Sequence, residues 1–286
     1  MPLHIENLKN WEFPEVRTVY LDKDVMLYAL SLGFGADPLN EQELPFVYEQ
    51  QLRAVPTMGA VLCHPGAWLT DPRTGATRSK VVHGEQRMQF HQPLPANGYL
   101  VSKARVIGIQ DKGSEKGAIL HLERQLIGED GTLFITIRHS SFCRADGGCG
   151  SFGATLTLKA LPTRPADQII TLPTSACAAL LYRLNVDRNP LHVDPAVAQK
   201  AGFTQPPLHG LCTYGMAARA LLKGWLDYAP QRLLSLDTRF SASVFPGETL
   251  QFETWHEGDG IAFRAFAQER GAKVLDNGWA TIAPAA

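Results

Sequence analysis

The clearest pattern in this chain is a period of two in the side chains near its C-terminal end. Leu250, Phe252 and Thr254 alternate with polar side chains. Apolar side chains then recur at every second position from 261 to 267. A period of two places alternate side chains on opposite faces of a strand. Both segments are therefore predicted to be half-buried β-strands.

Turn sequences rich in Gly and charged residues separate the predicted strands in both halves of the chain. They cover residues 111–117 and 129–131 in the first half, and 257–260 and 269–271 in the second. Short connections between antiparallel strands favour Asn, Asp and Gly. The pattern therefore predicts antiparallel hairpins in both halves.

One buried helix is predicted within the second half. Residues 211–222 carry apolar or small side chains at 211, 214, 215, 218, 221 and 222, close to the spacing of a buried helix face. A helix wrapped by a curved antiparallel sheet is the hot-dog architecture. The two halves also share an order of features, since residues 24–30 parallel residues 178–184. The expected fold is α+β, a double hot-dog of two tandem repeats in which the helix of the first repeat is degenerate.

The boundaries between the repeats follow from composition. A Gly-rich stretch at 147–153 and a Pro-bearing stretch at 161–173 are typical of a connection. In the first half, Asp37 follows the helical stretch but no His comes after it, so this repeat is expected to be non-catalytic. The expected division is a first repeat at 1–155, a linker at 156–174 and a catalytic second repeat at 175–286.

Candidate chemistry is concentrated in residues 182–210. Asp187, Asn189 and His192 place an acid, an amide and an imidazole in one short turn. Pro190 stiffens this turn because its ring fixes φ. These groups are therefore candidates for proton transfer from a rigid turn.

The same segment carries signals for two helix starts. Asp194 and Pro195 are predicted to be the N-cap and first residue of a short helix that ends at Gly202. A second loop then delivers His209 and Gly210 to the start of the buried helix. The candidate turn is thus held between two helices.

This spaced pattern resembles the R-specific enoyl-CoA hydratases, or hydratase 2, of the MaoC-like group. The signature D-x-N-P-L-H, D-P, A-G-F and L-H-G-L is present at 187–192, 194–195, 201–203 and 208–211. The similarity extends through the first half at 48–49, 83–86, 94–95 and 111–114. One position departs from the pattern, because Val186 stands where the family commonly has a small residue, often Gly.

The resemblance implies syn hydration of a trans-2-enoyl-CoA to a (3R)-3-hydroxyacyl-CoA. His192 would act as the base on a water, Asp187 would return a proton to C2, and Asn189 would orient the water. The backbone N–H of Gly210 would form the oxyanion hole at a helix N-terminus. The resemblance further assigns substrate contacts to His83, Gly84, Lys112 and Phe240, and possible supporting roles to Glu49 and His209. The first repeat would bind the acyl and CoA portions.

Composition limits the class of protein, its partners and its cellular compartment. The 286 residues are 45% hydrophobic and 19% charged, as in ordinary globular proteins. A net charge of -1 argues against a nucleic-acid partner or a polybasic membrane contact. Five cysteines without C-x-x-C spacing indicate free thiols in a reducing compartment. The chain shows no signal-peptide pattern and no long apolar run, so a cytoplasmic location is expected. The expected assembly is a homodimer.

Other readings of the same residues remain open at this stage. An acyl-CoA thioesterase or a non-catalytic acyl-CoA-binding protein would share the fold, because function belongs to the site rather than to the fold. His192, Asp194 and His209 lack metal-ligand spacing on one face, so no metal is expected. No cofactor is expected either, since coenzyme A is part of the substrate.

Overall fold

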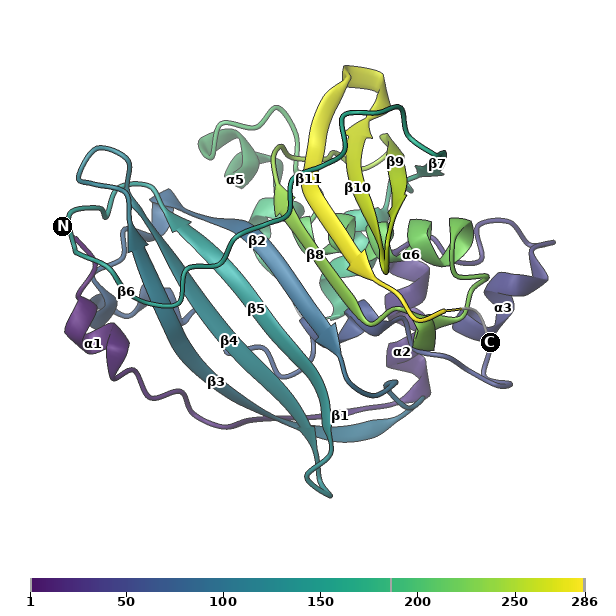
Figure 1. The fold of residues 1–286 in the computed structure, drawn as a ribbon, viewed down its shortest axis with the longest axis horizontal. Coiled ribbons are helices and arrows are strands. Elements are labelled where there is room, and N and C mark those ends of the chain that lie inside the picture. Colours follow the sequence, from purple (N-terminus) through teal and green to yellow (C-terminus); the bar gives the residue numbers. More distant parts are fainter. Residues whose placement is uncertain (1, 186, 285–286) are drawn as a thin grey trace.

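The computed structural model describes residues 2–185 and 187–284. Within these residues, 11 strands form one antiparallel sheet (Figure 1). The strands are β1 (Val16–Tyr20), β2 (Val81–Phe90), β3 (Gly98–Asp111), β4 (Ala118–Gly128), β5 (Leu133–Cys143), β6 (Phe152–Gly153), β7 (Gln168–Pro173), β8 (Ser235–Phe240), β9 (Thr249–Glu257), β10 (Gly260–Ala267) and β11 (Ala272–Thr281). Their order is β1-β3-β4-β5-β2-β8-β11-β10-β9-β7, and β6 pairs with β3.

Within the sheet, the two halves of the chain are joined by one pair of strands. β2 of the first half and β8 of the second lie side by side near the middle of the sheet (Figure 1). Their register runs from the pair Glu85 and Arg239 to the pair Gln89 and Ser235. One continuous sheet therefore spans both repeats, which confirms the predicted double hot-dog.

A long buried helix fills the second half. Helix α6 (Gly210–Gly224) matches the predicted helix at 211–222, and every residue from 212 to 222 is buried. The paired strands β7 to β11 form the half of the sheet that encloses it (Figure 1). The other α-helices are α1 (Ile5–Lys9), α2 (Asp22–Ser31), α3 (Leu44–Val47), α4 (Ala178–Tyr182) and α5 (Pro195–Lys200).

The first half has no comparable helix among its described residues. A buried segment at 54–63 occupies the core there, and its regular part is only the short 3₁₀ helix η2 (Pro56–Ala60). The segment lies very close to the sheet, since a Cβ at Gly59 would stand 2.4 Å from Cδ1 of Ile135. The helix of the first repeat is thus degenerate, as predicted. The remaining 3₁₀ helices are η1 (Glu41–Glu43), η3 (Trp68–Thr70), η4 (Pro72–Thr74), η5 (Arg78–Lys80), η6 (Arg183–Asn185), η7 (Pro190–His192), η8 (Pro230–Arg232) and η9 (Gln268–Arg270).

A buried ion pair ties the first half to α6. Arg219 of α6 donates from Nη2 to Glu43 Oε1 at 3.0 Å, and both side chains are buried. Arg219 also donates to the backbone oxygen of Leu32, while Glu43 accepts from the backbone N–H of Gly35. The pair needs these added hydrogen bonds, because a buried charge without partners is costly. The first half therefore supplies groups that the helix of the second half requires.

The alternating segments form the strands that the sequence predicts. Leu250, Phe252 and Thr254 of β9 are buried, and so are the alternate residues of β10 from 261 to 267. One prediction is partly wrong, because the expected linker at 156–174 contains strand β7, which pairs with β9. Ile170 and Leu172 of β7 are turned into the core. The alternation of buried and exposed residues in β7 covers only two buried positions and ends at a proline. In the sequence it is therefore hard to distinguish from a proline-containing linker.

Two further features concern the state of the cysteines and the length of the helices. All five cysteines are free, and Cys63, Cys143 and Cys212 are buried. Among residues 2–185 and 187–284, no helix combines the length and the apolar character that crossing a membrane requires.

Candidate active site

The candidate catalytic turn follows α4 and is held by its own side chains. Asp187 Oδ1 accepts a hydrogen bond from the backbone N–H of Asn189 at 3.1 Å. Asn189 Oδ1 accepts one from the N–H of Leu191, also at 3.1 Å, and thereby caps η7. Pro190 is the first residue of η7, where its missing N–H costs nothing. The turn is therefore stiff, as predicted, while Val186 lies outside the described residues.

The neighbouring helix starts as the sequence predicts. Asp194 caps α5 by accepting from the N–H groups of Ala196 and Val197. Pro195 is its first residue, and Gly202 follows its end with a positive φ of 89°. Asp194 thus has a structural role as a helix cap, and Asp187 is the carboxylate of this segment that faces the cavities.

Three side chains converge at this turn. The candidate donor atoms of Asp187, His192 and His209 all lie within 4.8 Å of one another. His192 and His209 come from different loops, yet their rings stack with centroids 3.8 Å apart and an interplanar angle of 27°. The structure therefore brings together an acid and two imidazoles from both ends of the predicted segment.

A backbone contact fixes the tautomer of His192. Its Nδ1 lies 2.8 Å from the backbone oxygen of Pro207. Because a carbonyl oxygen only accepts, Nδ1 must carry the proton and donate it. The neutral ring then has its lone pair on Nε2, as a general base requires.

His209 holds the turn rather than presenting a second base. Its Nε2 donates to the backbone oxygen of Asp187 at 3.1 Å, and its ring lies 5.0 Å from that of Tyr182. Burial, with a smaller contribution from the nearby His192, lowers the pKa of His209 to about 4. His209 is therefore neutral at pH 7 and can stack on His192 without charge repulsion.

The first turn of α6 faces the same place. Gly210 begins this 15-residue helix and is exposed, and a Cβ added there would stand 3.5 Å from the ring of Phe240. The N–H groups of a first helical turn have no partner within the helix, and the helix dipole makes them favourable to negative charge. Gly210 is thus placed where an N–H can meet a developing oxyanion.

Two cavities meet at the turn. The larger, of about 470 Å³, is lined by Phe240, the loop at 241–244, Arg144 and the start of β2. The smaller, of about 350 Å³, is lined by Ala60, Val61, Tyr182 and residues 66–67. Asp187 and Asn189 line both cavities, together with His64 and Leu211. The acid and the amide therefore lie between two spaces, each large enough for part of an organic ligand.

Family models match both halves of the chain. The model described as MaoC like domain matches residues 158–277, and the model described as MFE-2 hydratase 2 N-terminal domain matches residues 19–145. Enoyl-CoA hydratase ChsH3 of Mycobacterium tuberculosis is 35% identical over 97% of this chain and 98% of its own length. The chain belongs to the MaoC-like hydratase 2 family.

Further relatives agree with this family. Peroxisomal multifunctional enzyme type 2 of Mus musculus is 36% identical over 96% of this chain, which spans 38% of that longer protein. A MaoC-like dehydratase from Phytophthora capsici has the same fold, with a TM-score of 0.88, 32% identity and coverage of 99% of this chain and 100% of its own. As a member of the hydratase 2 family, the chain is an enzyme of the hydro-lyase type.

The substrate-binding residues expected for a hydratase 2 enzyme divide into two groups. His83 and Phe240 line the larger cavity, and their rings meet edge to face with centroids 4.8 Å apart. Gly84 lies beside them in a bulge of β2. Lys112 is exposed in the turn after β3, Glu49 is exposed after α3, and neither lines the two cavities. The roles of Lys112 and Glu49 stay predictions.

Two cavity residues have no counterpart among the sequence predictions. His64 lines both cavities, and Arg144 adds a cation to the larger one. His64 follows the buried segment of the first half, and Arg144 follows β5. Neither belongs to a local motif, so only the pairing of distant strands reveals them.

Buried histidines predict how stability depends on pH. Burial lowers the pKa of His83 and His121 to about 4, and that of His139 well below its usual value. In the unfolded chain these residues bind protons below pH ~6.5, whereas in the native state they do not. The unfolded state thus binds more protons, so the free energy of unfolding should fall as pH drops from about 6.5 toward 4.

Urea unfolding at pH 7 and pH 5 measures this dependence. His121 lies on β4 and its Nδ1 is 2.9 Å from Ser140 Oγ, so His121→Gln can keep a polar contact without titrating. This variant should lose less stability than the native chain between the two pH values. An equal loss in both proteins would contradict the assignment for His121.

Proposed function

We propose that this chain catalyses reversible syn hydration of trans-2-enoyl-CoA to (3R)-3-hydroxyacyl-CoA. The observation that carries the proposal is the position of Asp187 at the meeting point of two cavities, beside His192, which lines the larger cavity and whose Nδ1 is held by Pro207. One cavity would take the acyl chain and the other the pantetheine arm. The reacting double bond would then lie beside the acid and the imidazole.

The proposed reaction adds one water across the double bond. As the water oxygen bonds to C3, a proton of the water passes to Nε2 of His192. That proton is then passed from His192 through Asp187, which holds the same water from its other side, to C2 on the same face. One water thus supplies both the hydroxyl at C3 and the hydrogen at C2, and the addition is syn. Asn189 orients the water or the carboxylate. Well-placed acid and base groups contribute roughly 100- to 10,000-fold to such a rate.

The thioester oxygen gains negative charge during this step. We assign its stabilisation to the N–H of Gly210, which opens α6 at the edge of the larger cavity. One oxyanion donor contributes about 3–4 kcal/mol in enzymes where it has been removed. Arg144 at the larger cavity suits the phosphates of coenzyme A, which places the CoA portion on that side.

The first test combines an absorbance assay on crotonyl-CoA with a thiol reagent. Loss of the enoyl signal without free thiol is the expected result. Release of free thiol would indicate the alternative thioesterase, and no change with any acyl length would indicate a non-catalytic acyl-CoA-binding protein.

The product is expected to be the 3R isomer. Coupling to an S-specific hydroxyacyl-CoA dehydrogenase checks this, because efficient NADH formation there would contradict the proposed stereochemistry.

Acyl-chain preference gives a second test of the proposal. The smaller cavity lies against the buried segment of the first half, where no long helix fills the core. The enzyme should therefore accept chains of roughly C8 and longer as well as crotonyl-CoA. Measuring kcat/KM from C4 to C16 checks this, and a sharp drop beyond C4 would contradict it. Ala67→Trp, at the exposed wall of this cavity, should lower kcat/KM for long chains more than for C4.

We further propose that the enzyme acts as a homodimer in the cytoplasm and needs no cofactor or metal. Five free cysteines favour a reducing compartment. One nitrogen of His192 and one of His209 are already bound to backbone oxygens, as expected for positioned imidazoles rather than a metal cage. Sedimentation equilibrium tests the dimer, and activity after treatment with a chelator tests the absence of a metal.

A further inference from the structure

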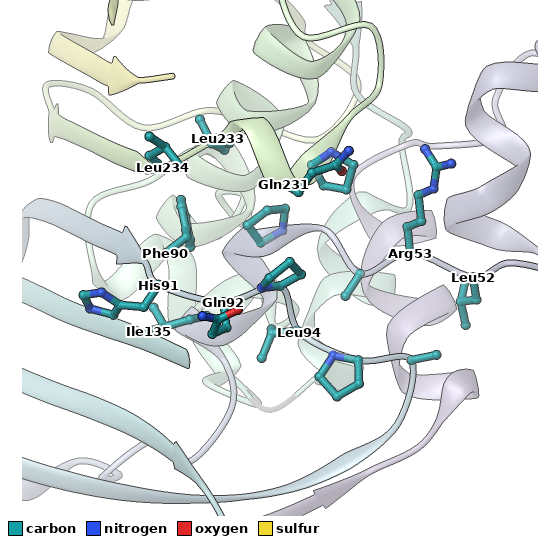
Figure 2. A pocket seen from close by; sticks show the side chains of 16 residues that line it. Leu52, Arg53, Phe90, His91, Gln92, Leu94, Ile135, Gln231, Leu233 and Leu234 are labelled. Atoms are coloured by element: carbon teal, nitrogen blue, oxygen red, sulfur yellow. The ribbon is translucent and has the colours of Figure 1, made fainter. Parts of the chain in front are cut away.

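A third cavity, separate from the two at the catalytic turn, lies at the opposite end of the β2–β8 junction. It has a volume of about 460 Å³ and is called the distal cavity below. Figure 2 shows its labelled side chains, which come from both halves of the chain. Its walls are Leu52, Arg53, Ala54 and Pro56, Phe90 to Ala96, Ile135, Pro230, Gln231, Leu233 and Leu234. None of the catalytic residues lines it.

The register of the junction has an internal two-fold symmetry. Arg87 of β2 pairs with Asp237 of β8, and Asp237 follows Arg87 by 150 positions. Gln89 pairs with Ser235 and Glu85 with Arg239. The same shift of 150 takes Glu85 to Ser235 and Gln89 to Arg239. A pseudo-two-fold axis therefore passes through the pair Arg87 and Asp237, and it exchanges β2 with β8.

This axis relates the distal cavity to the larger catalytic cavity. The same shift takes Phe90, the last residue of β2, to Phe240, the last residue of β8. Phe240 lines the catalytic cavity and Phe90 lines the distal one. The residue after each phenylalanine makes the same kind of backbone hydrogen bond. The N–H of His91 donates to Phe134 O at 2.8 Å, and the N–H of Ser241 donates to Val274 O at 2.9 Å.

The remaining walls correspond as well. The catalytic cavity is closed by the start of β2 and by the residues that lead into α6. The distal cavity is closed by Leu233 and Leu234, just before β8, and by residues 52–56, which lead into η2. The two volumes, about 470 and about 460 Å³, are also alike. The distal cavity is thus the symmetry counterpart of the space assigned to the CoA portion.

The counterpart of the catalytic turn is missing from the distal cavity. In the first half, α2 is followed by residues 32–40, and none of them lines this cavity. Asp37 instead accepts from the N–H of Leu39, and Asn40 donates to Tyr228 Oη at 3.2 Å. The distal cavity therefore has walls like those of the catalytic cavity but no acid–base pair.

We propose that the distal cavity binds the pantetheine arm of a second acyl-CoA without hydrating it. The inference rests on the proposed function, because the ligand class is taken from the catalytic counterpart. Phe90, Leu94 and Leu234 supply apolar contact for the methylene groups of the arm. Gln92 and Gln231 offer amides to its two amides, and Arg53 offers a cation to its phosphates.

Counting bound ligands tests this proposal. S-butyl-CoA, a thioether with no double bond and no cleavable thioester, is titrated into the full chain by calorimetry or equilibrium dialysis. The native chain should bind two molecules per chain. Gln92→Trp and Ala242→Trp form a matched pair, because each residue is exposed and stands two positions after the symmetry-related phenylalanine. Each variant should bind one molecule, and the double variant should bind none.

Removing the charge of Arg53 tests whether the phosphate end of the coenzyme A lies beside this residue. Arg53→Gln should weaken the site that survives in Ala242→Trp by about tenfold, the scale of one charge-assisted contact. Arg17→Gln serves as its control, because Arg17 is an exposed arginine of β1 that lines neither cavity. Circular dichroism confirms that all variants are folded.

The outcomes separate this proposal from the proposed function. If the native chain hydrates crotonyl-CoA but binds one S-butyl-CoA, and Ala242→Trp binds none, the distal site is overturned and the hydratase stands. If the native chain binds none and does not hydrate any enoyl-CoA, both proposals fail. An unchanged count in Gln92→Trp would also overturn the distal site.

Discussion

Asp187→Asn and His192→Ala should each lower turnover of an enoyl-CoA by at least ~100-fold while the protein stays folded. Asp187 lies at the meeting point of the two cavities and His192 beside it in the larger one, and each would act in the step that forms the C3–O bond. Asp187 is exposed, and Asn keeps an oxygen that can accept from the N–H of Asn189. The loss should therefore appear in kcat, with an unchanged melting curve.

A neighbouring acid provides the matched control for this experiment. Asp194 stands seven positions after Asp187 but caps α5 and lines neither cavity. Asp194→Asn keeps a good N-cap residue and should retain turnover close to that of the native enzyme. If Asp187→Asn also kept near-native turnover with a normal melting curve, Asp187 would not be the catalytic acid.

The fragment that contains only residues 161–286 should be insoluble or self-associated, although it carries every proposed catalytic residue. Its strand β8 would lose its partner β2 and become an open sheet edge. The face of α6 that meets the first half would be exposed, and Arg219 would lose Glu43. The first half is thus required for folding, even though it holds no acid–base pair.

Expression of the fragment alone and together with residues 1–160 tests this requirement. Static light scattering and sedimentation report its association state. Co-expression should recover soluble protein that hydrates crotonyl-CoA, because the separate halves can pair β2 with β8 again. A soluble, monomeric fragment with full activity would show that the second repeat folds and works without the first.

The sequence predicts those parts of the fold that depend on local patterns. The strands around Leu250 and Phe263 follow from alternation, and the start of α5 follows from Asp194 and its neighbouring proline. These features need only a few consecutive residues, because strand faces and helix caps are set locally. The candidate turn at 187–192 has the same local character, because its side-chain hydrogen bonds join residues only two positions apart.

The rest depends on contacts between residues far apart in the chain. Strand β7 gives too short an alternation to stand out from a Pro-bearing linker. His64 and Arg144 reach the cavities only because the strands of the first half pair as they do. The bond from His192 to Pro207 O fixes a tautomer that no motif encodes. Long-range pairing of this kind has no local signal in a single sequence.

The missing helix of the first repeat also has a consequence for synthesis of the chain. Strand β2 and the buried segment at 54–63 leave the ribosome long before α6 and β8, which complete their surroundings, since β8 begins more than 100 residues after β2 ends. At roughly 5–20 residues per second, this interval lasts on the order of ten seconds. During that time the nascent first half has an unpaired edge strand and an uncovered core. We therefore expect the nascent chain to complete its native fold only once the second half has been made and β8 can pair with β2.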